Sequence, residues 1–162
     1  MIHPNWGFIL SRPAYLLAFG FGAGLSPYAP GTVGTLVGFP LYLLLATFLS
    51  KPGVLTALVV LFALGVWWCD TTGKAVGVAD YGGIVWDEII AMALILCFTP
   101  AAPGWWITAF IVFRFFDIFK PWPIRVVDER MQNGFGVMLD DLLAAGFSIA
   151  SILGAEALIR GV

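Results

Sequence analysis

The sequence predicts an all-α protein that forms one multi-pass membrane bundle of about five to six helices. Of its 162 residues, 60% are hydrophobic and only 11% are charged, whereas soluble domains have about 45–50% and about 25%. The apolar residues form helix-length runs, separated by short segments rich in glycine, proline and charge. The length suits a single domain, residues 1–162, because no linker or internal repeat divides it.

The net charge and the rare residue types exclude several functional classes. A formal net charge of -2 gives a nucleic-acid partner little electrostatic support. Cys69 and Cys97 lie in apolar runs without metal-ligand spacing, so both are expected to be buried and unpaired. The one histidine, His3, lies outside every polar cluster, which argues against a histidine nucleophile or a Ser-His-Asp triad.

The N-terminal segment is expected to lie at the membrane surface or to re-enter it. Residues 13–24 are apolar and then glycine-rich, and they are too few to cross a bilayer. Although Arg12 precedes an apolar run, glycine and proline follow at once without a clear cleavage site, so this segment is expected to belong to the mature protein. A glycine- and proline-rich loop is predicted for residues 20–35.

Three membrane spans are predicted from the longest apolar runs. The first two cover about residues 35–50 and 54–69 and are joined by a tight turn at Lys51-Pro52-Gly53. Both are shorter than the roughly 20 residues that a helix needs to cross about 30 Å of hydrocarbon. A polar interval follows at residues 70–88, and the last span is predicted at residues 142–159.

The apolar runs 89–98 and 105–116 are predicted to form a helical hairpin that turns at the Thr-Pro-Ala-Ala-Pro-Gly breaker between them. A single kinked span would put the acids before and after it on opposite membrane faces, whereas a hairpin puts them on one face. With the hairpin, six of the eight basic residues share that face, which the positive-inside rule makes cytoplasmic. The six are Arg12, Lys74, Arg114, Lys120, Arg125 and Arg130, and Lys51 and Arg160 lie opposite.

Acidic residues at three predicted helix ends indicate a site for a hard cation. Asp117 lies within the apolar segment FRFFDIF, where an unpaired carboxylate is costly. Asp87 and Glu88 precede one apolar run, and Asp140 and Asp141 precede another; acids in a first helical turn also complement the helix dipole. Mg²⁺ takes oxygen ligands, and waters and substrate phosphate oxygens usually remain among them. It is therefore the natural occupant of such a site.

Basic residues beside these acids predict a phosphate-binding role. Arg114, Lys120 and Arg125, with Lys74 from the preceding polar interval, could clamp a phosphate group. The i, i+3 spacing of Arg114, Asp117 and Lys120 also fits ion pairs within one helix. Backbone N–H groups at residues 32–35, where a loop leads into a helix, offer a further anion cradle.

Four motifs together resemble the phosphatidylglycerophosphatase A family over residues 16–158: GLSPYAPGTVGT, the segment ending GIVWDE, FRFFDIFKPWPIR and GFGVMLDD. The resemblance implies magnesium-dependent hydrolysis of phosphatidylglycerol phosphate to phosphatidylglycerol and inorganic phosphate at the bacterial inner membrane, with a phospholipid as the partner. It implies functional roles for Asp80, Asp87, Glu88, Asp117, Lys120, Asp140 and Asp141. From the first motif, Gly31, Thr32 and Thr35 are expected to bind phosphate, and Pro30, like Asp80, to support the site.

Two other functional classes fit parts of the pattern. An ion or proton transporter would use membrane-boundary carboxylates, but it has no use for the adjacent arginines and would place acids at mid-span. A lipid phosphotransferase also needs magnesium and paired aspartates, but its DGxxAR-type motif is absent from the sequence. Within the phosphatase class, direct attack by water and an aspartyl-phosphate intermediate both remain open, and the sequence is compatible with a homo-oligomer.

Overall fold

The computed structural model describes residues 4–161, which form helices and no β-strand. Three of the helices are long and apolar enough to cross a membrane: α3 (Pro30–Phe48), α4 (Lys51–Val76) and α8 (Gly134–Arg160). They confirm the predicted all-α membrane class. His3 lies outside the described residues.

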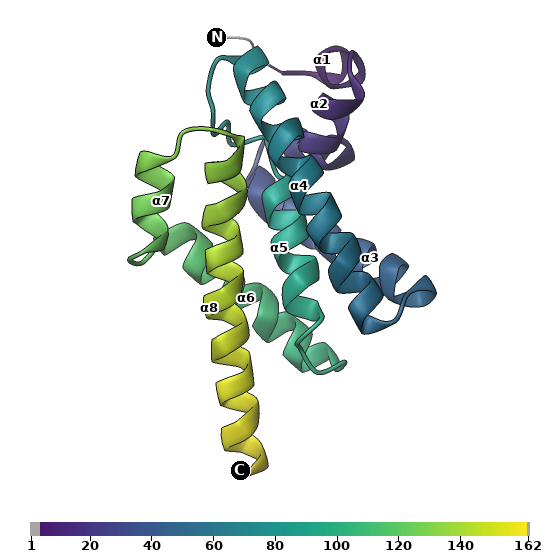
Figure 1. Cartoon of the computed structure of the whole chain (residues 1–162), viewed down its shortest axis with the longest axis vertical. Helices are drawn as coiled ribbons and strands as arrows, with labels where there is room; N and C mark the ends of the chain where they lie inside the picture. The colour runs from purple at the N-terminus through teal and green to yellow at the C-terminus, as the bar shows by residue number, and fades with distance from the viewer. Residues whose placement is uncertain (1–3, 162) are drawn as a thin grey trace.

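Shorter elements complete the bundle (Figure 1). The chain starts with α1 (Trp6–Leu10), α2 (Pro13–Ala18) and the 3₁₀-helix η1 (Gly20–Leu25), which gather beside one end of α4. The helices α5 (Trp86–Leu96), α6 (Pro103–Phe119) and α7 (Ile124–Arg130) lie between α4 and α8 in the chain. The described residues therefore form more helices than the five or six predicted, because several of the helices are short.

The predicted ends of the first two spans were wrong because proline starts both helices. Pro30 lies in the first turn of α3, and Pro52 lies in the first turn of α4, where a missing N–H costs nothing. The segment from Pro30 to Thr35 is therefore helix and not loop, and the chain reverses at Leu49–Ser50. Helix α4 also continues to Val76, seven residues beyond the predicted end.

The last span also begins earlier than predicted. Asn133 caps α8 by accepting a hydrogen bond from the N–H of Gly136 at 2.9 Å, which is the usual role of asparagine at this position. Asp140 and Asp141 therefore lie in the second turn of α8 and not before it. Both side chains are buried within the bundle.

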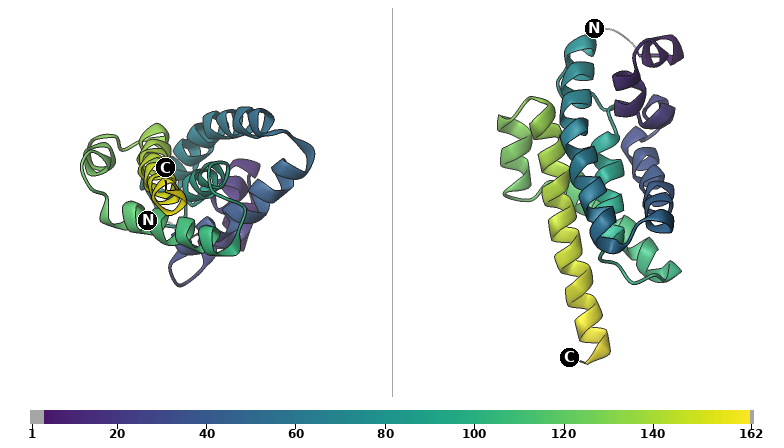
Figure 2. Two further views of the ribbon diagram at one scale, coloured as in Figure 1. Left: turned by 90° about the horizontal axis from the view of Figure 1, so that it is seen from below. Right: turned by 45° about the vertical axis from the view of Figure 1, so that its right-hand side comes forward.

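The helical hairpin is present as predicted. Helix α5 runs through the middle of the bundle, the chain turns at residues 97–102, and α6 returns towards the end from which α5 started (Figures 1 and 2). The 11 residues of α5 extend for only about 17 Å, well short of the hydrocarbon thickness. Helix α5 packs against α3, α4 and α8, and its first residues, Trp86 and Asp87, are buried inside the bundle.

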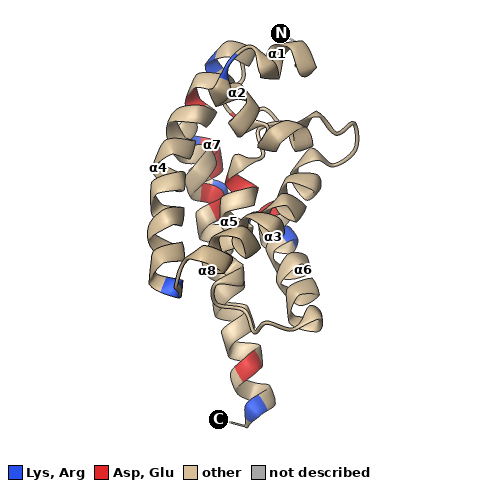
Figure 3. Cartoon of the chain, turned by 90° about the vertical axis from the view of Figure 1, so that its right-hand side faces the viewer, with Lys and Arg blue, Asp and Glu red and all other residues tan. Residues whose placement is uncertain are grey.

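The charged residues are distributed as the hairpin requires. Figure 3 shows most of them in the upper part of the molecule and around the start of α5. A few lie at the opposite end, where α4 begins with Lys51 and α8 ends with Arg160. The acids before the hairpin and those after it are thus on the same side of the bundle.

Close contact between α3 and α5 sets the position of α5. A Cβ atom built on Gly38 would lie 2.7 Å from Cβ of Met92 and 2.9 Å from the carbonyl oxygen of Ile89. Gly34, one turn earlier, would meet Val85 in the same way. Only glycine at these positions lets the two backbones approach so closely.

This contact can be tested with two glycine variants in membrane-spanning helices. We expect Gly38→Ala to lower the stability of the protein by about 1–3 kcal/mol, because the added methyl group overpacks the α3–α5 contact. Gly146→Ala in α8 is the matched control, since its methyl group would enter open space and improve helix propensity. Thermal unfolding in detergent measures both, and equal melting temperatures would contradict the proposed tight contact.

Candidate active site

Three carboxylates converge where α5 begins. Asp87 and Glu88 lie in the first turn of α5, and Asp141 reaches them from α8. One oxygen from each of the three lies within 4.8 Å of the others. Asp87 is only 8% exposed and Asp141 only 3%, so the cluster lies inside the bundle and not on its surface.

The cluster has unused oxygen atoms. Asp87 Oδ1, Glu88 Oε2 and Asp141 Oδ2 are buried and have no hydrogen-bond partner in the protein. Burying an ionised carboxylate without a partner is costly, and a cation bound by these oxygens would remove that cost. The residues thus fit the predicted Mg²⁺, which prefers oxygen ligands.

Arg114 connects this cluster to two further helices. Its Nη1 donates to Asp117 one turn later on α6 and lies 3.8 Å from Glu88 Oε1. The same nitrogen lies 3.4 Å from the Thr35 hydroxyl oxygen of α3, to which it donates. Arg114 Nε is buried without a partner, so the guanidinium keeps a free donor for a ligand.

The first turns of α3 touch the site directly. A Cβ atom on Gly31 would overlap Glu88 Oε1 and lie 3.3 Å from Arg114 Nη1, so glycine is required for this approach. Thr35 is fully buried, and its hydroxyl donates to the Gly31 carbonyl at 2.8 Å. The predicted backbone cradle is less available, because the N–H of Thr32 already donates to the Ala29 carbonyl at 2.9 Å.

Lys120 forms a second charged group next to the cluster. Its Nζ lies 2.7 Å from Asp128 Oδ1 on α7 and 2.5 Å from Asp140 Oδ2 on α8. Burial would lower the pKa of Lys120, but the carboxylates of Asp140 and Asp128 outweigh it and raise the pKa above its usual value. The ammonium is therefore charged at physiological pH. Lys120 ends α6 in the left-handed backbone region, with φ 41° and ψ 62°.

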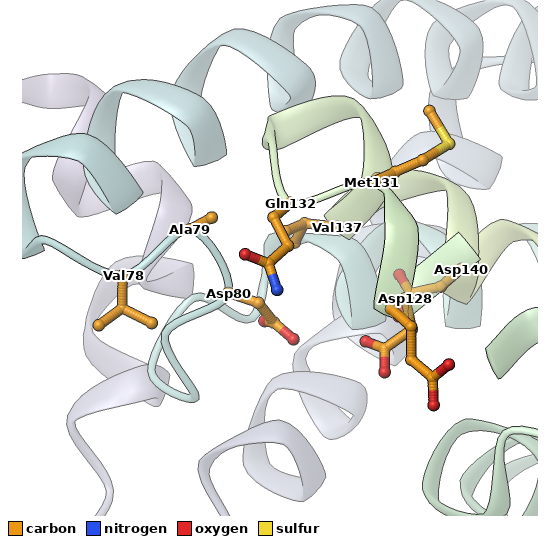
Figure 4. Close-up of a pocket in the computed structure, with 10 residues that line it drawn as sticks. Val78, Ala79, Asp80, Asp128, Met131, Gln132, Val137 and Asp140 are labelled. Carbon is orange, nitrogen blue, oxygen red and sulfur yellow. The ribbon is translucent and has the colours of Figure 1, made fainter. Parts of the chain in front are cut away.

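A cavity of about 340 Å³ opens beside Asp128 and Asp140, the two carboxylates that bind Lys120. The carboxylates of Asp80, Asp128 and Asp140 line it from three different segments (Figure 4). Loss of water around Asp80 raises its pKa, and Lys120 partly offsets that effect. Asp140, which lines the cavity, directly precedes Asp141 of the carboxylate cluster on α8.

Asp128 was not among the predicted site residues. It lies in a short polar segment after the FRFFDIFKPWPIR motif, and it pairs with Lys120 across eight residues of sequence. The residue spacing alone gives no signal for such a pair, because Pro121 and Pro123 reorient the chain between them. The one available signal was a carboxylate following the FRFFDIFKPWPIR motif.

Two predicted phosphate ligands are not brought to the cluster. Lys74 is 76% exposed and pairs with Asp70 at 2.6 Å, and Arg125 is 72% exposed and pairs with Glu129 at 2.7 Å. Both are pairs between neighbouring turns of one helix. The structure therefore assembles Arg114 and Lys120 with the acids and leaves the other two cations at the surface.

The chain is similar to known proteins over most of its length. The family model described as Phosphatidylglycerophosphatase A matches residues 16–156. The chain belongs to this family. A protein named Phosphatidylglycerophosphatase A from Haemophilus influenzae is 43% identical over 148 residues, which cover 91% of each chain. A protein of the same name from Escherichia coli is 46% identical over 142 residues, or 86% of this chain and 81% of that protein.

This phosphatidylglycerophosphatase A family member is accordingly a phosphatase enzyme. No solved structure matches the chain. The four motifs that carried the resemblance contribute the start of α3, the start of α5, the α6 end with Lys120, and the first turns of α8. The folded chain brings all four to one place.

The Thr35 hydroxyl can be tested with a matched pair of variants. We expect Thr35→Val to lower phosphatase turnover by about tenfold or more, because Arg114 loses the oxygen that helps to orient it. Thr35→Ser keeps that oxygen and should retain near wild-type turnover. Steady-state phosphate release measures both, and equal activity of the two variants would remove the hydroxyl from the site.

Proposed function

We propose that this enzyme is a magnesium-dependent lipid phosphatase that converts phosphatidylglycerol phosphate to phosphatidylglycerol and inorganic phosphate. The observation that carries the proposal is the convergence of Asp87, Glu88 and Asp141, each with an unpartnered buried oxygen, next to two fixed cations. The two relatives from Haemophilus influenzae and Escherichia coli are named for the same substrate. Hydrolysis of a phosphomonoester needs both the carboxylate cluster and the cations, because the negative charge of the terminal phosphate must be neutralised before a nucleophile can attack it.

The reaction is proposed to take place at the cytoplasmic face of the bacterial inner membrane. Most of the basic residues lie at the end of the bundle that also holds the carboxylates, and the positive-inside rule assigns such an end to the cytoplasm. In this placement a lipid headgroup at the cytoplasmic bilayer surface would lie on the same side as the site.

Asp87, Glu88 and Asp141 would hold the magnesium ion. When bound, magnesium neutralises charge on the phosphate and lowers the pKa of a coordinated water. Asp117 and Asp140 were predicted as further ligands, but each already accepts a hydrogen bond from a cationic side chain, Arg114 or Lys120. We therefore assign these two aspartates to holding the cations in place.

Arg114 and Lys120 would bind the oxygens of the terminal phosphate. Arg114 has a donor to spare at Nε, and Lys120 supplies a fixed positive charge. These donors stabilise the charge that develops as the bond between phosphorus and the glycerol oxygen breaks. A carboxylate oxygen of the cluster would accept the proton from the attacking water and return it to the leaving glycerol oxygen, which gives the free hydroxyl group and inorganic phosphate.

Phosphate release from phosphatidylglycerol phosphate is the direct test. The purified protein in detergent should release inorganic phosphate with magnesium present, and a chelator should abolish the release until magnesium is restored. Catalytic release that persists in excess chelator would contradict the magnesium requirement. Absence of release with magnesium present would contradict the substrate.

Replacement of one cluster carboxylate gives a sharper prediction. We expect Asp141→Asn to lower kcat/KM by at least about a hundredfold, on the scale of losing a metal ligand or its support. Glu156→Gln is the matched control on the same helix, because Glu156 pairs with Arg160 at the other end of α8. Near-normal turnover of the Asp141 variant would remove it from the site.

Direct attack by water can be separated from an aspartyl-phosphate intermediate. When borohydride is added during turnover, we expect no aspartate to be reduced, because direct attack by water forms no acyl phosphate. A trapped phosphoenzyme, or an aspartate reduced by borohydride, would support the covalent route.

A further inference from the structure

Two positions for positive charge lie side by side in this site. The first is the cluster of Asp87, Glu88 and Asp141 with its unpartnered oxygens. The second is next to it, because Asp140 directly precedes Asp141 and its Oδ1 accepts the N–H of Asp141 at 3.0 Å. The other oxygen of Asp140 binds Lys120.

Phosphatases with two metal ions hold the ions about 3.5–4 Å apart, which requires two adjoining sets of ligands. Here the acids nearest the cluster, Asp128 and Asp140, already bind a cationic side chain. Lys120 Nζ contacts Asp140 at 2.5 Å and Asp128 at 2.7 Å, distances at which the ammonium occupies the space that an ion would need. Among residues 4–161, one group of three acidic ligands converges closely enough to hold a metal ion.

The lysine is held there by three separate elements. Lys120 itself is the residue that ends α6, Asp128 comes from α7, and Asp140 comes from α8. Its side chain is 23% exposed and the Asp140 side chain 5%, so water competes only weakly for the pair. Figure 4 shows Asp128 and Asp140 next to each other at the cavity wall.

We propose that the Lys120 ammonium, positioned by Asp128 and Asp140, takes the place of a second metal ion. The site then works with one divalent cation and one built-in organic cation, and Asp128 is a positioning residue that acts through Lys120. This inference rests on the proposed function, since it assumes that the carboxylate cluster binds a divalent cation. It also explains why Lys120 binds Asp128 and Asp140, two carboxylates that line the cavity.

Counting bound Mn²⁺ tests the first part of the inference. Mn²⁺ serves as the probe for the magnesium site, measured by electron paramagnetic resonance on the full-length protein in detergent without substrate. We expect one tightly bound ion per chain and no signal from a spin-coupled pair. Two bound ions per chain would overturn the inference while leaving the phosphatase proposal intact, whereas none would overturn the metal site on which both depend.

Matched variants of α7 test the role of Asp128. Asp128→Asn and Glu129→Gln each remove one negative charge from the same helix, but Glu129 pairs only with the exposed Arg125. We expect Asp128→Asn to lower kcat by about tenfold or more and Glu129→Gln to leave kcat unchanged. Asp128→Glu should recover most of the loss, because it restores the carboxylate. An unchanged kcat in Asp128→Asn would overturn the positioning role.

A double variant shows whether Asp128 acts through Lys120. We expect Lys120→Met to lower kcat at least as much as Asp128→Asn, and the double variant to be no slower than Lys120→Met alone. Losses that multiply would show that Asp128 acts independently and would overturn the inference. Thermal unfolding of each variant separates lost chemistry from lost structure, and if Asp128→Asn fails to fold, the same comparison is made with Asp128→Ser, which also removes the carboxylate.

Discussion

The structure depends on balancing buried negative charge at the start of α5. Five carboxylates, those of Asp87, Glu88, Asp117, Asp140 and Asp141, meet only two fixed cations, Arg114 and Lys120. Isolated charges in such surroundings cost several kcal/mol each, so each helix that carries an acid is tied to a helix that carries a cation. The acids without a paired cation are the basis for the proposed cation site.

Glycine-mediated packing makes this balance possible. Because Gly34 and Gly38 allow α3 to lie directly on α5, the start of α3 reaches Glu88 and Arg114. The site is then closed on one side by Gly31 and Thr35 and on the other by α8. Small residues that let membrane helices approach closely here also shape the candidate site.

The sequence was informative about composition and charge placement and less so about helix boundaries. The hairpin could be predicted because the breaker at residues 99–104 and the acids at 87 and 88 leave one arrangement that gathers the charges. The starts of α3 and α8 could not be predicted, because the proline and the asparagine found there fit a loop as well as a helix start. Asp128 was missed because its partner Lys120 becomes a neighbour only after the chain turns at two prolines. Lys74 and Arg125 were wrongly assigned to phosphate binding, because each forms an ion pair with an acid one turn away on its own helix.

The backbone of Lys120 adds a consequence for how this family can change. A left-handed residue at the end of a helix is the place where glycine is favoured, and a lysine there costs about 1 kcal/mol of conformational strain. Glycine at position 120 would relax the helix end but would remove the ammonium. Selection for stability and selection for activity therefore act in opposite directions on this one residue, and a more stable chain with glycine there would have lost its built-in cation.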